Sequence, residues 1–236
     1  MIWFPKSCPN NCMKKVIRLS DEILVNSYCF ELMDSRTYML REGTKALVID
    51  PYEDEQLVAD LQGVSRITVI LTHEHYDHIS GVNFLKEKFD CCVYAGSICA
   101  KRVESPKDNL SDRFAFLFLT DREKYHYVRS NLKLPFSCRV DESFCGSMNL
   151  MWQKHQLELY EVGGHSPGSI FILLDKKVLF AGDNLLENGK QLQGTDSDRT
   201  TYEKDVKKIL DTWDLKLWVL PGHGEAKRLG DFNWNI

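Results

Sequence analysis

Four side chains that commonly bind metal ions lie within six residues of this sequence. Directly after the apolar run Ile67–Leu71 comes the segment His73-x-His75-x-Asp77-His78. Zinc and other borderline divalent ions prefer imidazole and carboxylate ligands. A helix would spread these side chains around its circumference, whereas a loop leaving a strand can direct them to one place. The alternation predicts that the first three point alike and that His78 points elsewhere, so that the segment serves two adjacent metals.

Three further candidate ligands, His165, Asp183 and His223, each follow a predicted strand and one or two small residues. Glycine at such a position lets the backbone approach a metal closely and adopt positive φ. Taken singly, a histidine there is more often structural than a ligand. Beside the first cluster, the metal interpretation is favoured. The remaining histidines, His126 and His155, lie outside this pattern, and we interpret them as structural.

The elements that must position these side chains are short apolar runs rich in β-branched and aromatic residues, which are typical of strands. Eight strands are predicted: Ile23–Phe30, Thr37–Leu40, Ala46–Ile49, Ile67–Leu71, Leu157–Val162, Ile170–Leu174, Val178–Phe180 and Leu217–Leu220. Three helices are predicted between them: Tyr52–Leu61, Gly81–Phe89 and Thr201–Trp213. Strands that come first in a run and then mix with helices suggest two sheets with helices packed outside, an α+β protein.

The stretch 97–145 has a different pattern, which predicts a largely helical insertion. Its segment Phe114–Leu119 is apolar on every side, so we expect it to be buried. We also expect this segment, with Tyr125 and Tyr127, to pack over or beside the metal edge and to shape a substrate pocket. The alternative is that it only seals the core or forms a dimer contact.

Composition narrows the class of protein. The chain has 236 residues, 43% of them hydrophobic and 27% charged, and no linker divides it, so we expect one domain over residues 1–236. With a net charge of −4, nucleic acid is not an expected partner. We expect a small-molecule substrate, no membrane contact and a cytoplasmic location, because no secretory signal or membrane-length apolar run is present. Cys8 and Cys12 are spaced like half of a zinc site, but no matching pair follows, and we interpret the eight cysteines as reduced thiols.

Taken together and in this order, the candidate ligands resemble the metal motifs of the metallo-β-lactamase superfamily. The resemblance covers about Val25 to Glu225 and implies a four-layer αββα sandwich with its site at one edge of the two sheets. It implies two groups of ligands and a bridge between them: His73, His75 and His165; Asp77, His78 and His223; and Asp183 as the bridge. Asp50, after the strand Ala46–Ile49, resembles an aspartate that supports the site from outside the ligand set.

Differences between this sequence and particular branches of the superfamily indicate which branch it resembles most. A histidine stands at His75, where the flavo-diiron branch usually has glutamate, which favours a hydrolase. The pattern is most similar to the hydroxyacylglutathione hydrolases (glyoxalase II). Those enzymes carry an added C-terminal helical region that contacts glutathione, whereas thirteen residues follow His223 here, so glutathione is one candidate carrier among several.

The resemblance implies two divalent ions, with zinc expected and iron or manganese as alternatives. Together they hold a bridging hydroxide that attacks an electrophilic carbon, and Asp77 both binds metal and orients this nucleophile. We expect a thioester or activated ester as the substrate. Hydrolysis of a lactone or β-lactam, hydrolysis of a phosphodiester, and iron-dependent redox chemistry are the alternatives.

Overall fold

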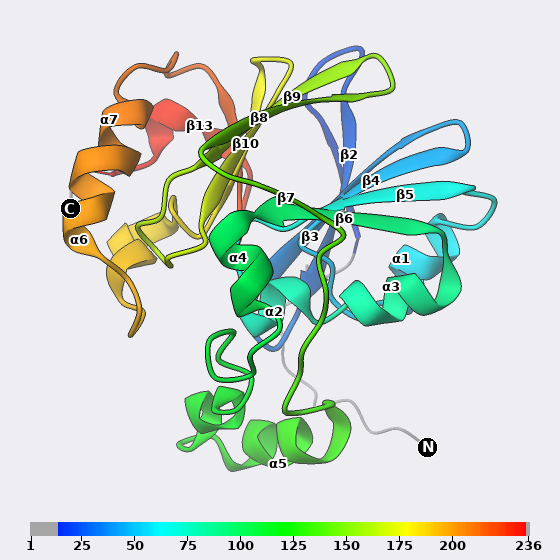
Figure 1. The fold of residues 1–236 in the computed structure, drawn as a ribbon, viewed down its shortest axis with the longest axis vertical. Helices are drawn as coiled ribbons and strands as arrows, with labels where there is room; N and C mark the ends of the chain where they lie inside the picture. Colours follow the sequence, from blue (N-terminus) through cyan, green and yellow to red (C-terminus); the bar gives the residue numbers. More distant parts are fainter. Residues whose placement is uncertain (1–13, 235–236) are drawn as a thin grey trace.

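Two β-sheets lie face to face between two layers of helices in the computed structural model, which describes residues 14–234 (Figure 1). Cys8 and Cys12 lie outside the described residues. Five of the described cysteines, Cys91, Cys92, Cys99, Cys138 and Cys145, are free thiols. Within the described residues, no helix is both long enough and apolar enough to cross a lipid bilayer.

The first sheet has seven strands, which lie side by side in the order of the sequence. They are β1 (Lys15–Arg18), β2 (Leu24–Phe30), β3 (Ser35–Glu42), β4 (Lys45–Ile49), β5 (Arg66–Ile70), β6 (Cys91–Gly96) and β7 (Glu142–Phe144). The strands β1 to β4 pair antiparallel, and β4 to β7 pair parallel. The parallel half matters for function, because the carboxyl ends of β4 and β5 reach the same edge of the sheet.

The second sheet has six strands in the order β13-β12-β11-β10-β9-β8. They are β8 (Ser147–Trp152), β9 (His155–Glu161), β10 (Ile170–Leu174), β11 (Val178–Gly182), β12 (Trp218–Pro221) and β13 (Lys227–Arg228). Only β11 and β12 pair parallel within this sheet, so their carboxyl ends also meet at one edge. All eight predicted strands are present. The strands β1, β6, β7, β8 and β13 were not predicted, because they are short, lie near sheet edges or carry polar and cysteine residues.

The first sheet is covered by α1 (Glu55–Asp60), α2 (Tyr76–Ile79), α3 (Val82–Lys88) and α4 (Ser97–Arg102). The second is covered by a continuous helical stretch made of α6 (Arg199–Thr201), the π-helical η3 (Tyr202–Val206) and α7 (Lys207–Leu210), and by the 3-10 turn η4 (Leu229–Asp231). Another 3-10 segment, η2 (Glu187–Leu192), precedes them. Two predicted helix starts were wrong for the same reason. Asp54 and Asp198 accept backbone N–H groups and so begin α1 and α6 immediately after themselves.

Three apolar clusters lie between the four layers and hold the sandwich together. Strand β4 illustrates how the sequence divides between them, because successive side chains of a strand point to opposite faces. Its Leu47 and Ile49 pack between the sheets, whereas Ala46 and Val48 pack against the helices of the first sheet. The predicted four-layer α+β sandwich is therefore confirmed.

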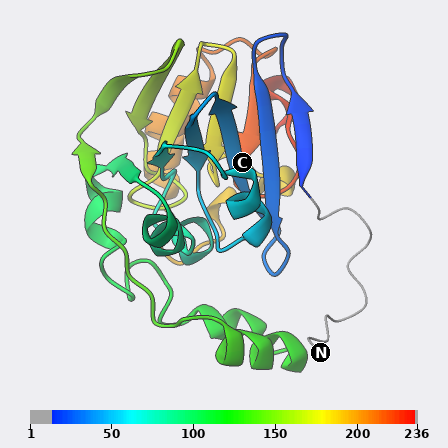
Figure 2. The same ribbon diagram turned by 90° about the vertical axis from the view of Figure 1, so that its right-hand side faces the viewer.

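The stretch 97–145 contains α4, the 3-10 segment η1 (Phe114–Phe118), the helix α5 (Arg122–Asn131) and the edge strand β7. Figure 2 shows α5, in green, standing away from both sheets. The expectation that all of Phe114–Leu119 is buried is wrong. Phe114 and Phe118 are buried, but Leu117 and Leu119 are 63% and 66% exposed. Among residues 14–234 no further layer lies outside this segment, so the described chain covers only its side that faces the first helical layer.

Candidate metal centre

The seven predicted ligands meet at the edge of the sandwich where β5, β11 and β12 end. His73 and His75 lie in the loop after β5, as predicted. Asp77 and His78, however, lie on the single helical turn α2, which begins directly after His75. The prediction that Asp77 points like the two histidines before it is therefore wrong. The turn of helix directs Asp77 together with His78 toward a second group of ligands.

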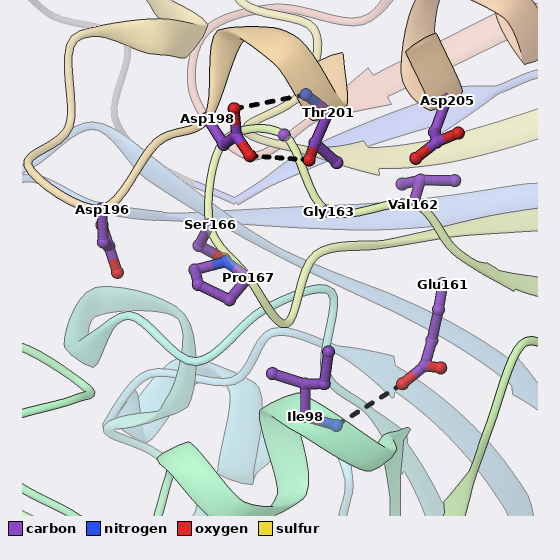
Figure 3. Close-up of a pocket in the computed structure, with 11 residues that line it drawn as sticks. Ile98, Glu161, Val162, Gly163, Ser166, Pro167, Asp196, Asp198, Thr201 and Asp205 are labelled. Atoms are coloured by element: carbon purple, nitrogen blue, oxygen red, sulfur yellow. Dashed lines mark hydrogen bonds between the residues drawn. The ribbon is translucent and has the colours of Figure 1, made fainter.

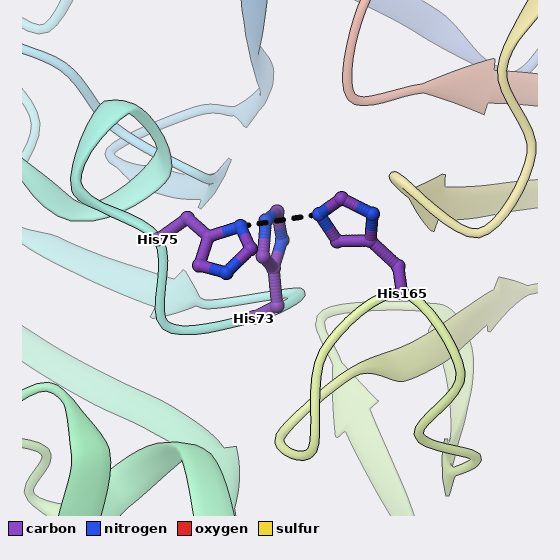
Figure 4. Close-up of side chains that lie close together, drawn as sticks. All are labelled: His73, His75 and His165. Carbon is purple, nitrogen blue, oxygen red and sulfur yellow. Dashed lines mark hydrogen bonds between the residues drawn. The ribbon is translucent and has the colours of Figure 1, made fainter. Parts of the chain in front are cut away.

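The first group consists of His73, His75 and His165, whose ring nitrogens lie close enough to hold one metal ion. Nε2 of His165 is 3.1 Å from Nδ1 of His75. Figure 4 shows the three rings converging from two separate segments, the loop after β5 and the loop between β9 and β10. All three side chains are buried, so a cation placed there would be largely shielded from water.

The second group consists of Asp77, His78 and His223. Nε2 of His78 lies 3.3 Å from Nε2 of His223. Oδ2 of Asp77 lies 3.4 Å from each of these two nitrogens. One carboxylate oxygen and two imidazole nitrogens thus converge, a donor set suited to zinc, iron or manganese.

Asp183 lies between the two groups. Its Oδ2 is 3.5 Å from Nε2 of His165 in the first group and 3.2 Å from Nε2 of His223 in the second. Its Oδ1 is 3.5 Å from Nε2 of His78. A single carboxylate therefore contacts ligands of both groups, with one oxygen directed between them.

Three atoms at this centre are buried without any hydrogen-bond partner among the described residues: His73 Nε2, Asp77 Oδ2 and Asp183 Oδ1. A buried polar atom left without a partner costs about 1–3 kcal/mol, and charged atoms cost more. Such atoms are rare in native proteins and require an explanation. All three face the space shared by the candidate ligands, and bound cations would satisfy each of them. The residues therefore fit a pair of metal ions.

Backbone carbonyls fix two of the rings from outside. Nδ1 of His165 donates to the carbonyl of Gln191 at 2.9 Å, and Nδ1 of His223 donates to the carbonyl of Met33 at 2.9 Å. With the outer nitrogen protonated, Nε2 is left with its lone pair facing the centre. Metal-binding histidines in proteins typically show this arrangement.

Asp50 fixes two more rings. Its Oδ2 accepts from Nδ1 of His78 at 3.2 Å, and its two oxygens accept from the backbone and the hydroxyl of Thr72. The Thr72 hydroxyl oxygen in turn lies 3.1 Å from Nδ1 of His73. Asp50 could also be grouped with His73 and His78 as a metal ligand. Because both of its oxygens are already occupied by these contacts, we interpret it as a support for the two histidines.

The charges of the centre shift its pKa values in opposite directions. Burial would raise the pKa of Asp183, but the neighbouring histidines, His223 foremost, hold it well below its usual value. Burial would lower the pKa of His223, but Asp183 and Asp77 raise it to about 9. Burial dominates at His165, whose pKa falls to about 4. Without metal, the carboxylates thus hold protons on the second group, where a metal would compete with them.

The carboxylate of Asp183 needs a glycine opposite it. A Cβ atom on Gly222 would lie 2.0 Å from Oδ1 of Asp183 and 2.9 Å from Cε1 of His78. Both distances are shorter than Cβ contacts in real structures. The small residue before His223 therefore serves close approach of two loops, as the sequence suggested.

A pocket of about 370 Å³ lies beside the first group. The loop that carries His165 forms one wall of it, through Gly164 and Ser166, and Asp196 lies on another (Figure 3). Nε2 of His75 donates to Asp196, so the pocket reaches the metal centre through this residue. Ile98, at the start of the 97–145 stretch, lines the same pocket.

Sequence reasoning missed three residues around this centre: Asp196, which contacts His75, and Arg102 and Glu74, which are linked to Asp196 by ion pairs. Glu74 carried a usable signal, because it lies between two predicted ligands. Arg102 and Asp196 lie in segments with no motif and approach the centre only through folding.

His126 and His155 belong to neither group of ligands. His155 is buried between Asp175 and Glu42, with its two ring nitrogens 2.5 and 3.1 Å from their carboxylates. His126 is exposed on α5. Within the described residues, neither of them belongs to a group of side chains placed to hold a metal ion.

Comparison with known proteins gives one family and one fold. A family model described as "Metallo-beta-lactamase superfamily" matches residues 32–223. Hydroxyacylglutathione hydrolase GloC of Haemophilus influenzae is 28% identical over 193 residues, which are 78% of this chain and 82% of that protein. The solved structure of the BLEG-1 B3 metallo-beta-lactamase superposes with a TM-score of 0.68 at 24% identity, covering 92% of this chain and 95% of BLEG-1. TTHA1623 in a di-iron-bound form gives a TM-score of 0.66 at 24% identity, covering 86% and 94%.

Proposed function

The chain belongs to the metallo-beta-lactamase superfamily, and we propose that it is a binuclear metal-dependent hydrolase acting on a thioester or similarly activated ester. One observation carries the proposal. Two adjacent groups of metal-ligand side chains, all buried except the half-buried His223, share Asp183, and three of their inward-facing atoms have no hydrogen-bond partner among the described residues.

In this proposal one ion is held by His73, His75 and His165, and the other by Asp77, His78 and His223, with Asp183 between them. Zinc suits these nitrogen and oxygen donors, and iron or manganese would also be accepted. The di-iron-bound form of TTHA1623, a protein of the same fold, makes iron the alternative to examine first. When bound, two such ions lower the pKa of water toward neutrality and stabilise negative charge that develops on an attacked carbonyl oxygen.

The protein's own residues supply orientation and charge. Nearby histidines, His78 foremost, hold the pKa of Asp77 well below its usual range, so this carboxylate is ionised at neutral pH. Its Oδ2 faces the space between His78 and His223. Asp77 can therefore accept a hydrogen bond from an attacking water and orient it. This is the catalytic role that we propose for Asp77, beyond binding metal.

The chemistry around the centre favours a substrate whose leaving group needs no strong acid. The nearby carboxylates are already engaged in other contacts: Asp50 with Thr72 and His78, and Asp196 with Arg102 and His75. A thiolate leaves without prior protonation, whereas an amine does not. A thioester is also supported by the similarity to GloC, which is named as a hydroxyacylglutathione hydrolase. The proposed partner is a small molecule, since nothing in the charge of the chain favours a polyanion.

The test is a substrate panel on protein fully loaded with zinc and, separately, with iron. We would compare kcat/KM for acyl thioesters, homoserine lactones, a chromogenic β-lactam and a bis-aryl phosphodiester, and follow oxygen uptake in parallel. The proposal expects the thioester to lead and Asp183→Asn to abolish turnover. A lead for the lactone, β-lactam or phosphodiester would overturn the thioester assignment. Oxygen uptake by the iron form without hydrolysis would overturn the hydrolase assignment altogether.

A further inference from the structure

An ion-pair network built from three separate segments reaches one candidate ligand, His75. Asp196 lies in the loop between η2 and α6, and its carboxylate oxygens lie 3.3 and 3.4 Å from Nε2 of His75. Arg102, at the end of α4, donates from Nη2 to Asp196 at 2.8 Å. The same guanidinium donates from Nε to Glu74, which adjoins His75 in the sequence.

Within this network His75 and Glu74 are buried, whereas Arg102 is partly exposed. His75 is 8% exposed and Glu74 is fully buried. The side chains of Asp196 and Arg102 are 18% and 22% exposed. Glu74 also accepts from the hydroxyl of Ser166, the residue after His165. The arginine therefore neutralises two carboxylates that flank the first group of ligands.

The geometry identifies Asp196 as the residue that orients His75, and Arg102 as the residue that holds Asp196 in place. His75 differs from the other four candidate histidine ligands, because it presents Nδ1 to the centre and Nε2 to the outside. Within the part of the chain that the structure describes, no carbonyl or neighbouring hydroxyl contacts its outer nitrogen, and Asp196 does so instead. A carboxylate there keeps the proton on Nε2 and makes Nδ1 a stronger donor, and losing such a partner typically weakens metal binding about 10–100-fold.

The carboxylate of Asp196 comes from a segment far from His75 in the sequence. Because Arg102 belongs to the 97–145 stretch and Asp196 to the loop before α6, both segments must close on the centre before His75 is fixed. Asp196 also lines the pocket beside the first group. Binding in that pocket and metal affinity at His75 are therefore linked through one side chain. The inference rests on the proposed function only in taking His75 as a metal ligand.

The experiment measures zinc affinity, site by site, by competition with a chromophoric chelator, and the absorption spectrum of the cobalt form. Asp196→Ala should weaken one of two bound ions about 10–100-fold and leave the other unchanged. Asp196→Glu should restore part of the loss. The matched control is Asp198→Ala, two residues away, which loses a helix-capping carboxylate that touches no candidate ligand. It should leave both affinities unchanged.

Arg102→Lys tests the second step, because lysine keeps the charge but lacks the planar fork that spans two carboxylates. It should weaken the same ion in the wild-type background and have no further effect when Asp196 is already alanine. An equal effect in both backgrounds would show that the arginine acts through Glu74 instead. The orienting role of Asp196 is overturned if Asp196→Ala leaves both affinities and the cobalt spectrum unchanged, or if it weakens both ions to the same extent. A chain that binds two ions but hydrolyses nothing would defeat the proposed function and leave this inference standing.

Discussion

The carboxylate of Asp50 accepts from Nδ1 of His78 at 3.2 Å, on the side of the ring that faces away from the candidate metals. The same carboxylate accepts from the Thr72 hydroxyl, which contacts Nδ1 of His73. His73 and His78 belong to different ligand groups. One buried aspartate therefore orients a histidine of each.

Asp50→Asn should weaken both metal ions, because an amide supports the ring of His78 less well than a carboxylate. Each affinity should fall about 10–100-fold, the usual cost of losing such a partner. The measurement is chelator competition at neutral pH, with Thr72→Ser as the control that keeps the hydroxyl. A loss confined to one ion would show that the hydroxyl does not transmit the effect to His73.

The two ligand groups predict that each chain binds two metal ions and that substituting a ligand of one group weakens only the ion of that group. His165→Ala should remove or weaken one ion and His78→Ala the other, whereas Asp183→Asn should damage both. Elemental analysis of protein saturated with zinc, manganese or iron gives the stoichiometry. At most one metal per wild-type chain under all three conditions would end the binuclear proposal.

Metal binding should release protons at neutral pH. The pKa of His223 is raised to about 9 and that of His78 is also raised, so both carry a proton that a metal must displace. Affinity should therefore rise with pH up to about 9. Calorimetry in two buffers of different ionisation enthalpy counts the protons released. Equal heats in both buffers would contradict the prediction.

Whereas metal affinity should rise with pH, the stability of the metal-free chain should fall as the pH rises. The folded pKa of His223 lies above its unfolded value, so the stabilisation it contributes is complete below about 6.5 and is lost as the pH rises toward 9. The Tm of chelator-treated protein should fall over this window, whereas that of metal-loaded protein should not. His223→Gln should flatten the metal-free profile, and an unchanged slope would rule out His223 as its source.

Gly222→Ala should lower the metal content without a change in any ligand. The new Cβ would overlap Oδ1 of Asp183, which faces the space between the two groups. Gly194→Ala is the matched control, because a Cβ there meets atoms only at 3.7 Å or beyond, an ordinary contact. The comparison uses elemental analysis and Tm of both variants. Full metal content in Gly222→Ala would mean that Asp183 can move aside and still bind.

Substitutions in the segment Phe114–Leu119 should affect the free energy of unfolding differently at buried and at exposed positions. Phe114 is buried, with its ring 4.7 Å from that of Tyr76 on α2, so Phe114→Ala should cost about 3–5 kcal/mol in the free energy of unfolding. Leu117→Ser should change it by no more than about 0.5 kcal/mol, because that side chain is exposed. Urea unfolding measures both. A raised KM in Leu117→Ser would support the prediction that this segment borders the substrate pocket, and an unchanged KM would count against it.

The sequence by itself determined the candidate metal ligands, the four-layer fold and the strands that carry these ligands. These features are local. Three histidines and an aspartate within six residues need no folding to be recognised, and a buried strand shows itself by continuous apolar residues such as those of β10 and β11. The buried aspartate Asp50 was also identified, through its resemblance to an aspartate that supports the metal site in the metallo-β-lactamase superfamily.

Tertiary structure alone decided what surrounds the centre. Arg102 and Asp196 are separated from His75 by 27 and 121 residues, and an isolated arginine or aspartate in a loop has no pattern that reveals its partner. The turn of helix that pairs Asp77 with His78 depends on packing, since four residues do not form a stable helix on their own. The exposure of Leu117 likewise follows from which surfaces the layers leave uncovered. Apolar composition indicates that burial of a segment would be favourable, but only the folded layers decide whether a surface is there to pack against it.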